Sequence, residues 1–121
     1  MIGFIGCGSM GGALARAAAK AVPPADLLLS SRTRARAERL AEELGARVSD
    51  NETIASTCRY LFLGVKPQAL GALLASLRPV LEAREDRFVL VSMAAATPAE
   101  RVQELAGHPW PVIRIMPNIP T

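Results

Sequence analysis

Cysteine, histidine and aromatic residues are scarce in this chain of 121 residues. It contains two cysteines, Cys7 and Cys58, a single histidine, His108, and only 4% aromatic residues. Because the cysteines form neither a CxxC pair nor a cluster with histidine, a disulfide scaffold and a zinc module are both disfavoured. His108 lies between Gly107 and Pro109, which is typical of a surface loop, so we do not expect it to act as a general base.

Long hydrophobic runs are also absent, although 50% of the residues are hydrophobic. Charged residues interrupt every apolar stretch before it reaches the roughly 20 residues that a membrane-spanning helix needs. Met1 leads directly into an apolar segment, without the charged region that opens a secretory signal. We therefore expect a cytoplasmic protein with no membrane partner, and the length favours one domain over residues 1–121.

The charge balance is basic, with 14 Lys and Arg residues against 11 Asp and Glu residues and a formal net charge of +3. A basic chain can bind nucleic acid, but such a site usually stacks bases on aromatic side chains, which are rare here. The basic residues are also interspersed with acidic ones. We therefore expect a solvated basic surface and no nucleic-acid partner.

Short apolar segments alternate with helical patterns along the chain. Each apolar segment is bounded by glycine, proline or polar residues, as buried parallel strands are. The expected strands cover residues 2–5, 27–29, 47–48, 60–65, 88–91 and 112–115. The alternation predicts an α/β fold of the Rossmann type: a doubly wound, mainly parallel sheet of about six strands with helices on both faces.

Capping residues mark the expected helices. Helices are predicted over about residues 11–21 and 33–44, the second with Gly45 as its C-terminal cap. Either Asp50 or Asn51 is expected to cap a short helix that runs through residue 54. Leucines at 70, 73, 74, 77 and 81 form one face of a helix beyond Pro67. The segment Thr97–Glu100 indicates a capping box with proline at the first helical position.

A glycine-rich turn follows the first expected strand. The segment Gly6-Cys7-Gly8-Ser9-Met10-Gly11 fits G-x-G-x-x-G, which is weak alone but stronger where it leaves a strand and opens a helix. Gly6 would permit the tight turn, Gly8 the approach of a pyrophosphate, and Gly11 close contact between helix and strand. The helix N-terminus adds amide donors and a positive dipole. The segment predicts a dinucleotide site, and the alternative is a structural turn without a ligand.

The end of the second expected strand indicates which dinucleotide binds. An NAD site usually has an Asp or Glu there, which accepts a hydrogen bond from the ribose 2′-hydroxyl. This chain has Ser30-Ser31-Arg32-Thr33 instead. Two hydroxyls and a guanidinium suit a 2′-phosphate, so NADP(H) is predicted rather than NAD(H). The alternative is that the arginines form an exposed helix face, which we expect for Arg36 and Arg39.

Three further segments are expected at the same edge of the sheet, where ligands of parallel sheets bind. Lys66-Pro67 follows the strongest strand, and its lysine either approaches the ligand or is an ordinary loop residue. Small residues in Ser92–Ala96 would leave room for a nicotinamide ring, and Met116–Pro120 follows the last strand. The sequence shows no nucleophile–base pair, carboxylate pair or metal cluster, which fits hydride transfer, because the cofactor then carries the reactive chemistry.

Four segments in order resemble pyrroline-5-carboxylate reductases: Gly3–Gly11, Leu63–Gln68, Ser92–Ala95 and Arg114–Asn118. The glycine turn is shared with many Rossmann enzymes, whereas Val-Lys-Pro-Gln and Met-Pro-Asn are more specific to this family. The resemblance runs over all 121 residues. It implies NADPH-dependent reduction of the imine of 1-pyrroline-5-carboxylate, a small-molecule substrate, to proline.

The resemblance also implies roles for individual residues. The pyrophosphate would be held by the turn, the 2′-phosphate by the end of the second strand, and the adenosine side would lie along Asn51. Two further segments would flank the nicotinamide, and Lys66 and Asn118 are the candidates for catalytic residues. The cofactor-binding candidates are Ile5, Gly6, Cys7, Gly8, Ser9, Met10, Gly11, Ser30, Ser31, Arg32, Asn51, Gly64, Val65, Lys66, Pro67, Met93, Ala94 and Ala95.

The chain departs from the family pattern at Ser9, at Ala96, where glycine is usual, and at Ile119, where threonine is usual. It also lacks the family's helical domain, which dimerises and supplies most of the substrate pocket. We therefore expect NADP(H) binding with little or no turnover of pyrroline-5-carboxylate, and a homo-oligomer only for a longer protein. The alternatives are a non-catalytic NADP-binding module, which Ala96 and Ile119 favour, and a related oxidoreductase such as a cofactor-F420:NADP reductase.

Overall fold

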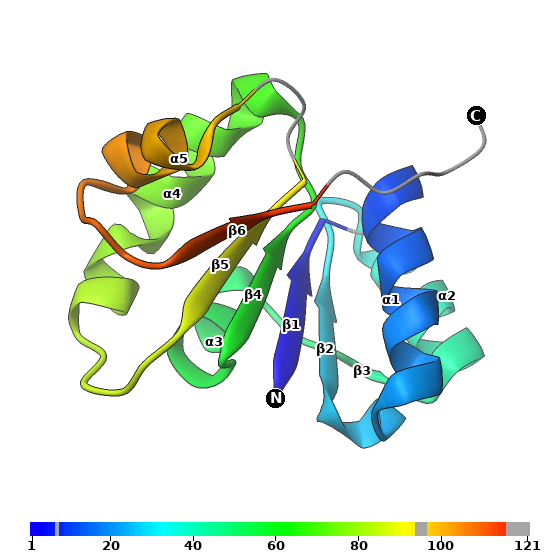
Figure 1. The fold of residues 1–121 in the computed structure, drawn as a ribbon. Helices are drawn as coiled ribbons and strands as arrows, with labels where there is room; N and C mark the ends of the chain where they lie inside the picture. The colour runs from blue at the N-terminus through cyan, green and yellow to red at the C-terminus, as the bar shows by residue number, and fades with distance from the viewer. Residues whose placement is uncertain (7, 94–96, 116–121) are drawn as a thin grey trace.

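The centre of the fold is a sheet of six strands (Figure 1). The computed structural model describes residues 1–6, 8–93 and 97–115. In chain order the strands are β1 (Ile2–Ile5), β2 (Leu27–Ser30), β3 (Arg47–Val48), β4 (Tyr60–Leu63), β5 (Val89–Ser92) and β6 (Val112–Arg114). Their order in the sheet is β3-β2-β1-β4-β5-β6, and every neighbouring pair is parallel.

Helices cover both faces of this sheet (Figure 1). They are α1 (Ser9–Ala21), α2 (Arg34–Leu44), α3 (Asn51–Thr57), α4 (Pro67–Glu82) and α5 (Ala99–Ala106), with a short 3-10 helix, η1 (Pro24–Asp26). Helices α1 and α2 pack on one face, and α3, α4 and α5 pack on the other. The predicted doubly wound α/β architecture is confirmed. Within the described ranges, no helix is both long and apolar enough to span a membrane.

The strands build two apolar cores because successive side chains point to opposite faces. Phe4, Leu27 and Leu29 face α1 and α2, whereas Ile5 and Leu28 face the three helices on the other side. Phe4 also stacks on Phe62 of β4, its partner in the sheet register, with ring centroids 4.5 Å apart. The central strands are therefore apolar on both faces, as their sequences predict.

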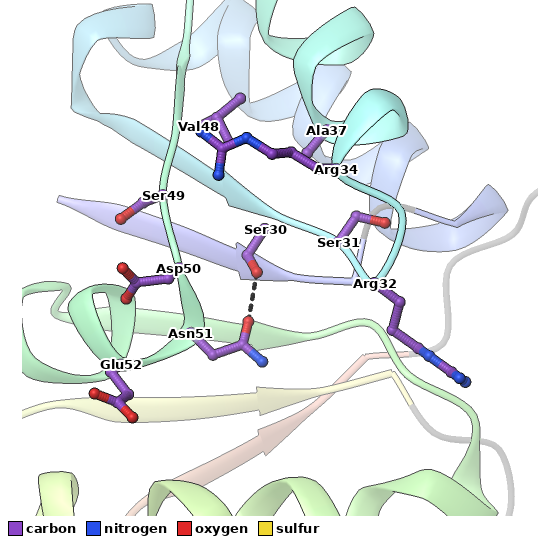
Figure 2. A pocket seen from close by; sticks show the side chains of 10 residues that line it. All are labelled: Ser30, Ser31, Arg32, Arg34, Ala37, Val48, Ser49, Asp50, Asn51 and Glu52. Atoms are coloured by element: carbon purple, nitrogen blue, oxygen red, sulfur yellow. Dashed lines mark hydrogen bonds between the residues drawn. The ribbon is translucent and has the colours of Figure 1, made fainter.

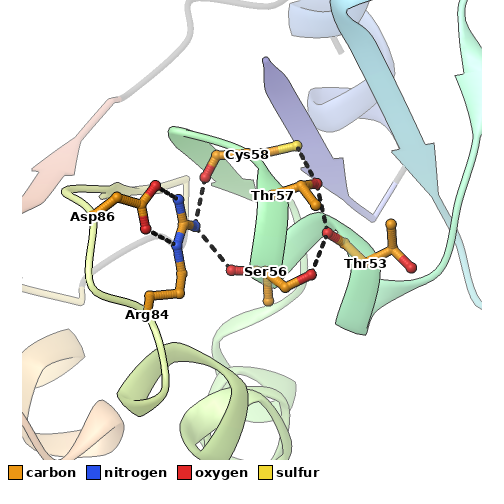
Figure 3. Close-up of polar contacts among 7 residues, drawn as sticks. Thr53, Ser56, Thr57, Cys58, Arg84 and Asp86 are labelled. Atoms are coloured by element: carbon orange, nitrogen blue, oxygen red, sulfur yellow. Dashed lines mark hydrogen bonds and ion pairs between the residues drawn. The ribbon is translucent and has the colours of Figure 1, made fainter.

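A buried arginine holds the C-terminal end of α3 (Figure 3). The side chain of Arg84 is only 4% exposed. Its guanidinium donates to the carbonyl oxygens of Ala55 and Cys58 at 2.9 and 2.6 Å, and to both carboxylate oxygens of Asp86. It also lies over the ring of Phe88, 4.8 Å from the centroid. Arg84 thus satisfies carbonyls that a helix end leaves without intrahelical partners.

Several helix starts differ from the expected ones. Helix α1 begins at Ser9, two residues before the predicted start. At α3 one of the two predicted caps is confirmed: Asp50 is the N-cap, and its Oδ1 accepts from the Thr53 amide at 2.6 Å. The predicted capping box is wrong by one residue. Pro98 has an extended ψ of 158° and is itself the N-cap, so that α5 begins at Ala99. Its carbonyl, not that of Thr97, accepts from the amides of the first turn.

Other boundaries of strands and helices differ from the predicted ones by a few residues, and one helix contains a proline in its interior. Strand β4 ends at Leu63, two residues before the predicted end, and the Gly64 amide makes the last bond of its ladder with β1, to the carbonyl of Ile5 at 2.7 Å. Helix α3 continues to Thr57, and α2 ends at Leu44, followed by the predicted cap Gly45 in a left-handed conformation with φ 75°. Helix α4 contains Pro79 in its interior, which the leucine pattern did not reveal.

Candidate functional site

The candidate site lies where the chain connections diverge, at the C-terminal ends of β1 and β4. These strands are neighbours, but β1 is followed by α1 on one face of the sheet and β4 by α4 on the other. In open α/β sheets such a switch point leaves a crevice at the strand ends, where ligands bind. The glycine turn follows β1 and Lys66 follows β4, so both lie at this edge of the sheet.

Three glycines meet at the switch point. Gly6 has φ +98°, and a Cβ on it would lie 2.6 Å from the carbonyl oxygen of Gly64. A Cβ on Gly11 would overlap the carbonyl oxygen of Gly6, and one on Gly64 would lie 3.4 Å from Cα of Gly11. The start of α1, the turn after β1 and the end of β4 therefore touch backbone to backbone. Gly64 lies outside the G-x-G-x-x-G pattern, so the motif does not reveal its packing role.

Gly8 is different, because, among the described residues and apart from its chain neighbours and the nearby backbone of α1, no atom lies within 4 Å of a Cβ built on it. Its φ of −74° and ψ of −162° are open to any residue. Nothing in the described protein therefore requires glycine here. Gly8 is the N-cap of α1, whose first turn contains no acidic residue. Open space beside a helix N-terminus fits the approach of an anionic group to backbone amides.

A hollow of about 560 Å³ lies next to this turn, at the end of β2 (Figure 2). Ser30, the last residue of β2, connects the two places, since its carbonyl accepts from the Gly6 amide at 2.9 Å. Its hydroxyl donates to Oδ1 of Asn51 at 2.5 Å. The structure thus brings Ser30, Ser31, Arg32 and Asn51 into one hollow, as candidate site residues from two separate segments.

Charges of opposite sign line different parts of the hollow. Arg32 and Arg34 come from the β2–α2 connection, whereas Asp50 and Glu52 come from the start of α3. Arg34 donates to Glu38 at 2.9 Å. Hydrogen bonds from Thr53 hold the pKa of Asp50 below its ordinary value. Among the described residues, the structure gives Arg32 no ion pair, and Figure 2 shows its side chain extending away from the Ser30–Asn51 pair.

A second hollow, of about 440 Å³, lies between α1 and α2 and includes Gly8. Arg36 and Arg39 line it, although both are exposed, as expected for a helix face. Arg16 in the same hollow is paired with Glu43 at 2.7 Å. The sequence predicts an ordinary exposed helix face for Arg36 and Arg39. Their three-residue spacing puts them on one side of α2 and so indicates that they could line the same hollow.

Other candidate residues contribute backbone or packing at the same edge. Ile5 and Met93 are 2% and 1% exposed, so both residues are almost completely buried; Ile5 belongs to the core, and the end of the Met93 side chain lies beside Gly64. Val65 packs partly against the core. Lys66 is exposed and is the N-cap of α4, and Pro67 is the first residue of that helix.

Some sequence candidates cannot be placed. Cys7, Ala94, Ala95 and Asn118 lie outside the described residues, as do Ala96 and Ile119, on which the non-catalytic alternative depends. Ser9 and Met10 belong to the first turn of α1, but their side chains are likewise outside the description.

Comparisons with known proteins agree with this geometry. Residues 1–96 match the family model described as NADP oxidoreductase, coenzyme F420-dependent. The chain is 36% identical over 121 residues to a pyrroline-5-carboxylate reductase of Methanosarcina acetivorans, covering 98% of this chain and 44% of that protein. It is 33% identical to the Pseudomonas aeruginosa reductase, covering 98% and 43%. The chain thus spans less than half the length of these curated relatives.

Solved structures show the same likeness. A pyrroline-5-carboxylate reductase from Coxiella burnetii superposes with a TM-score of 0.88 at 23% identity, over 98% of this chain and 44% of that one, which supports the fold. A Plasmodium falciparum pyrroline carboxylate reductase with NADP bound superposes with a TM-score of 0.74 at 26% identity, over 97% and 42%. The chain therefore belongs to the NADP oxidoreductase, coenzyme F420-dependent family, and the resemblance to pyrroline-5-carboxylate reductases that its motifs predict is confirmed.

Proposed function

We propose that this chain is the cofactor-binding part of an NADPH-dependent reductase that converts 1-pyrroline-5-carboxylate to proline. The observation that carries the proposal is the open space at Gly8, beside a hollow whose strand-end residues are Ser30, Ser31 and Arg32. A pyrophosphate fits the first place, and a ribose with a 2′-phosphate fits the second. The two places are joined by the hydrogen bond between the Gly6 amide and the Ser30 carbonyl.

The proposed roles follow from this arrangement. Backbone amides of the turn from Ile5 to Gly11 hold the pyrophosphate, and Asn51 faces the adenosine. Val65–Pro67 and Met93–Ala95 lie on either side of the nicotinamide, with Gly64 in close backbone contact with the turn. The nicotinamide supplies the hydride that reduces the imine carbon. The chain's own part is to bind, orient and shield, with Lys66 and Asn118 as candidates for contact with the substrate.

We further propose that NADPH is preferred over NADH. A carboxylate at the end of β2 would repel a 2′-phosphate, and Ser30, Ser31 and Arg32 occupy that position instead. Arg32 makes no ion pair within the described ranges, so its guanidinium is available to a phosphate. The NADP-bound relative supports a nicotinamide cofactor for this fold.

The test is a titration of the purified chain with NADPH and with NADH, for the wild type and two arginine variants. Arg32→Ala is expected to weaken NADPH binding about 10-fold or more, because a charge-assisted contact is lost, and to leave NADH binding nearly unchanged. Arg101→Ala is the matched control and should leave both affinities unchanged, since Arg101 lies on α5, outside the hollow, and is paired with Glu104. Equal affinity of the wild type for both cofactors, or no binding of either, would overturn the proposal.

We also propose that residues 1–121 form one dinucleotide-binding domain, and that a helical segment like that of the relatives supplies the substrate pocket and the oligomer interface. The coverage of about 44% of a relative supports this division. The chain should then bind NADPH yet oxidise it slowly with pyrroline-5-carboxylate, whereas a longer protein should turn over. NADPH oxidation with oxidised coenzyme F420 as the hydride acceptor, and none with the imine, would favour the related oxidoreductase instead. A cytoplasmic location remains a prediction from the sequence.

A further inference from the structure

We propose that Ser30 is a positioning residue: its hydroxyl fixes the amide of Asn51 so that the amide NH2 is presented to the adenosine half of the cofactor. This inference rests on the proposed function and changes the role that the sequence predicts for the Ser30 hydroxyl. Its one proton is donated to Asn51, which leaves Ser31 and Arg32 for the 2′-phosphate. It starts from the hydrogen bond between Ser30 and Asn51, which joins residues 21 positions apart in the wall of the hollow (Figure 2).

Ser30 is held in place by β1 and the turn that follows it. It is the last residue of β2 and pairs with Ile5 in the sheet register. Its carbonyl accepts from the Gly6 amide at 2.9 Å, and the residue is only 7% exposed. The hydroxyl is therefore carried by a backbone that is hydrogen-bonded at the end of β2, with little freedom to move away from Asn51.

Asn51, in contrast, needs a partner to fix its amide. It is the first residue of α3, and its backbone is held because Asp50 caps that helix. The terminal torsion of an asparagine is broad and nearly two-fold, so two orientations of the amide group compete. A hydroxyl that donates to Oδ1 selects one of them, because the NH2 group can only donate. Figure 2 shows the amide nitrogen on the side away from Ser30.

The charges around the hollow indicate what this NH2 group would meet. Arg32 offers a positive charge, which suits a phosphate, while Asp50 and Glu52 line the part beside Asn51 and disfavour one. The NH2 group therefore suits an uncharged acceptor. Adenosine offers such acceptors in its ring nitrogens and ribose oxygens. The fixed amide of Asn51 would thus donate a hydrogen bond to the adenosine, and Arg32 would bind the phosphate.

The experiment compares binding of NADPH, 2′,5′-ADP and nicotinamide mononucleotide to the wild type and to Ser30→Ala. Because the positioning hydroxyl is lost, the affinity for NADPH and for 2′,5′-ADP should fall about 5- to 10-fold, which is the effect expected from the loss of one hydrogen bond. Binding of nicotinamide mononucleotide should not change, because it does not reach the hollow. Ser30→Thr keeps the hydroxyl and should restore affinity. Unchanged affinity of Ser30→Ala for 2′,5′-ADP would overturn the inference alone.

A double-mutant cycle separates positioning from a direct contact. In the Asn51→Ala background, Ser30→Ala should cause almost no additional loss, because the group that Ser30 orients is gone. Two fully additive losses would overturn the inference.

Side-chain NMR of Asn51 provides a readout without cofactor: one well-resolved NH2 pair is expected in the wild type, and line broadening or a shift toward the random-coil position in Ser30→Ala. An unaltered NH2 pair in that variant would contradict the inference. A wild-type chain that binds neither NADPH nor 2′,5′-ADP would overturn the proposed function and this inference together, whatever the NMR result.

Discussion

A Cβ atom on Gly6 would lie 2.6 Å from the carbonyl oxygen of Gly64, so the turn after β1 and the end of β4 are in backbone contact. The contact spans the switch point of the sheet. It brings the first amides of α1 to the same edge as the start of α4. Side chains at these two positions would push that edge apart.

Gly6→Ala is therefore expected to destabilise the fold by roughly 2–4 kcal/mol, because it combines a positive φ with a backbone clash. Gly8→Ala is the matched control: a Cβ there meets open space, and stability should stay within about 1 kcal/mol of the wild type. The control should instead weaken NADPH binding, since the Cβ fills the room for the pyrophosphate. Urea unfolding and NADPH titration measure the two effects. Comparable stability losses in both variants would refute this division of roles.

Arg84→Met is expected to destabilise the protein by about 2–4 kcal/mol, because the carbonyls of Ala55 and Cys58 lose their buried donor. Asp86→Asn should cause a smaller loss, since Arg84 would keep both carbonyl contacts. Chemical denaturation of the two variants beside the wild type checks the order. If Asp86→Asn were the more damaging change, the ion pair rather than the helix cap would be the important contact.

Acid should destabilise the protein because hydrogen bonds lower the pKa of four carboxyl groups in the folded state. A carboxyl group whose pKa is lower in the folded state stabilises the fold fully when the pH is above its ordinary pKa, which is 3.8 for Asp and 4.5 for Glu. This stabilisation is lost as the pH falls through the pKa of the folded state. The urea midpoint should thus be flat near pH 6 and fall below about pH 4.5. The groups, each with its main donor, are Glu43 with Arg16, Asp50 with Thr53, Glu82 with His108 and Asp86 with Arg84.

The same measurement on Asp86→Asn should show a weaker dependence below pH 4.5, because one of the four groups no longer titrates. A pH profile identical to that of the wild type would show that the pairing of Asp86 with Arg84 does not contribute to acid stability.

Cys58 should resist alkylation in the native protein. Its side chain is buried against β1, and burial raises the pKa of its thiol, while the thiolate is the reactive form. Iodoacetamide labelling, mapped to Cys58 by peptide mass spectrometry, should follow unfolding as urea is added. Rapid labelling of Cys58 without denaturant would mean that α3 opens locally from the sheet.

Local patterns in the sequence predict most of the fold. The alternation of strands and helices identifies the six strands, and Gly45 ends α2 as expected. Pro98 shows the limit of such patterns: the ring fixes φ but not ψ, and an extended ψ of 158° delays the helix by one residue.

Contacts between distant segments could not be predicted in the same way. Asp50 and Asn51 are both good helix caps; Asp50 takes that role, whereas the Asn51 side chain accepts from Ser30, 21 residues earlier in the chain. Arg84 stands among charged residues and has the pattern of a surface residue. It is buried because the carbonyls of Ala55 and Cys58, 29 and 26 residues earlier in the chain, need a donor.

The place of β1 at the centre of the sheet has a consequence for synthesis on the ribosome. Ile2 pairs with Leu27 on one side and with Tyr60 on the other, so its second partner follows about 58 residues later. At roughly 5–20 residues per second, that edge of β1 stays unpaired for about 3–12 s after it is made. Phe62, the register partner of Phe4 in β4, is made only after this delay and can then stack on Phe4. Nascent chains stalled before β4 should therefore recruit chaperones, whereas chains stalled beyond it should not.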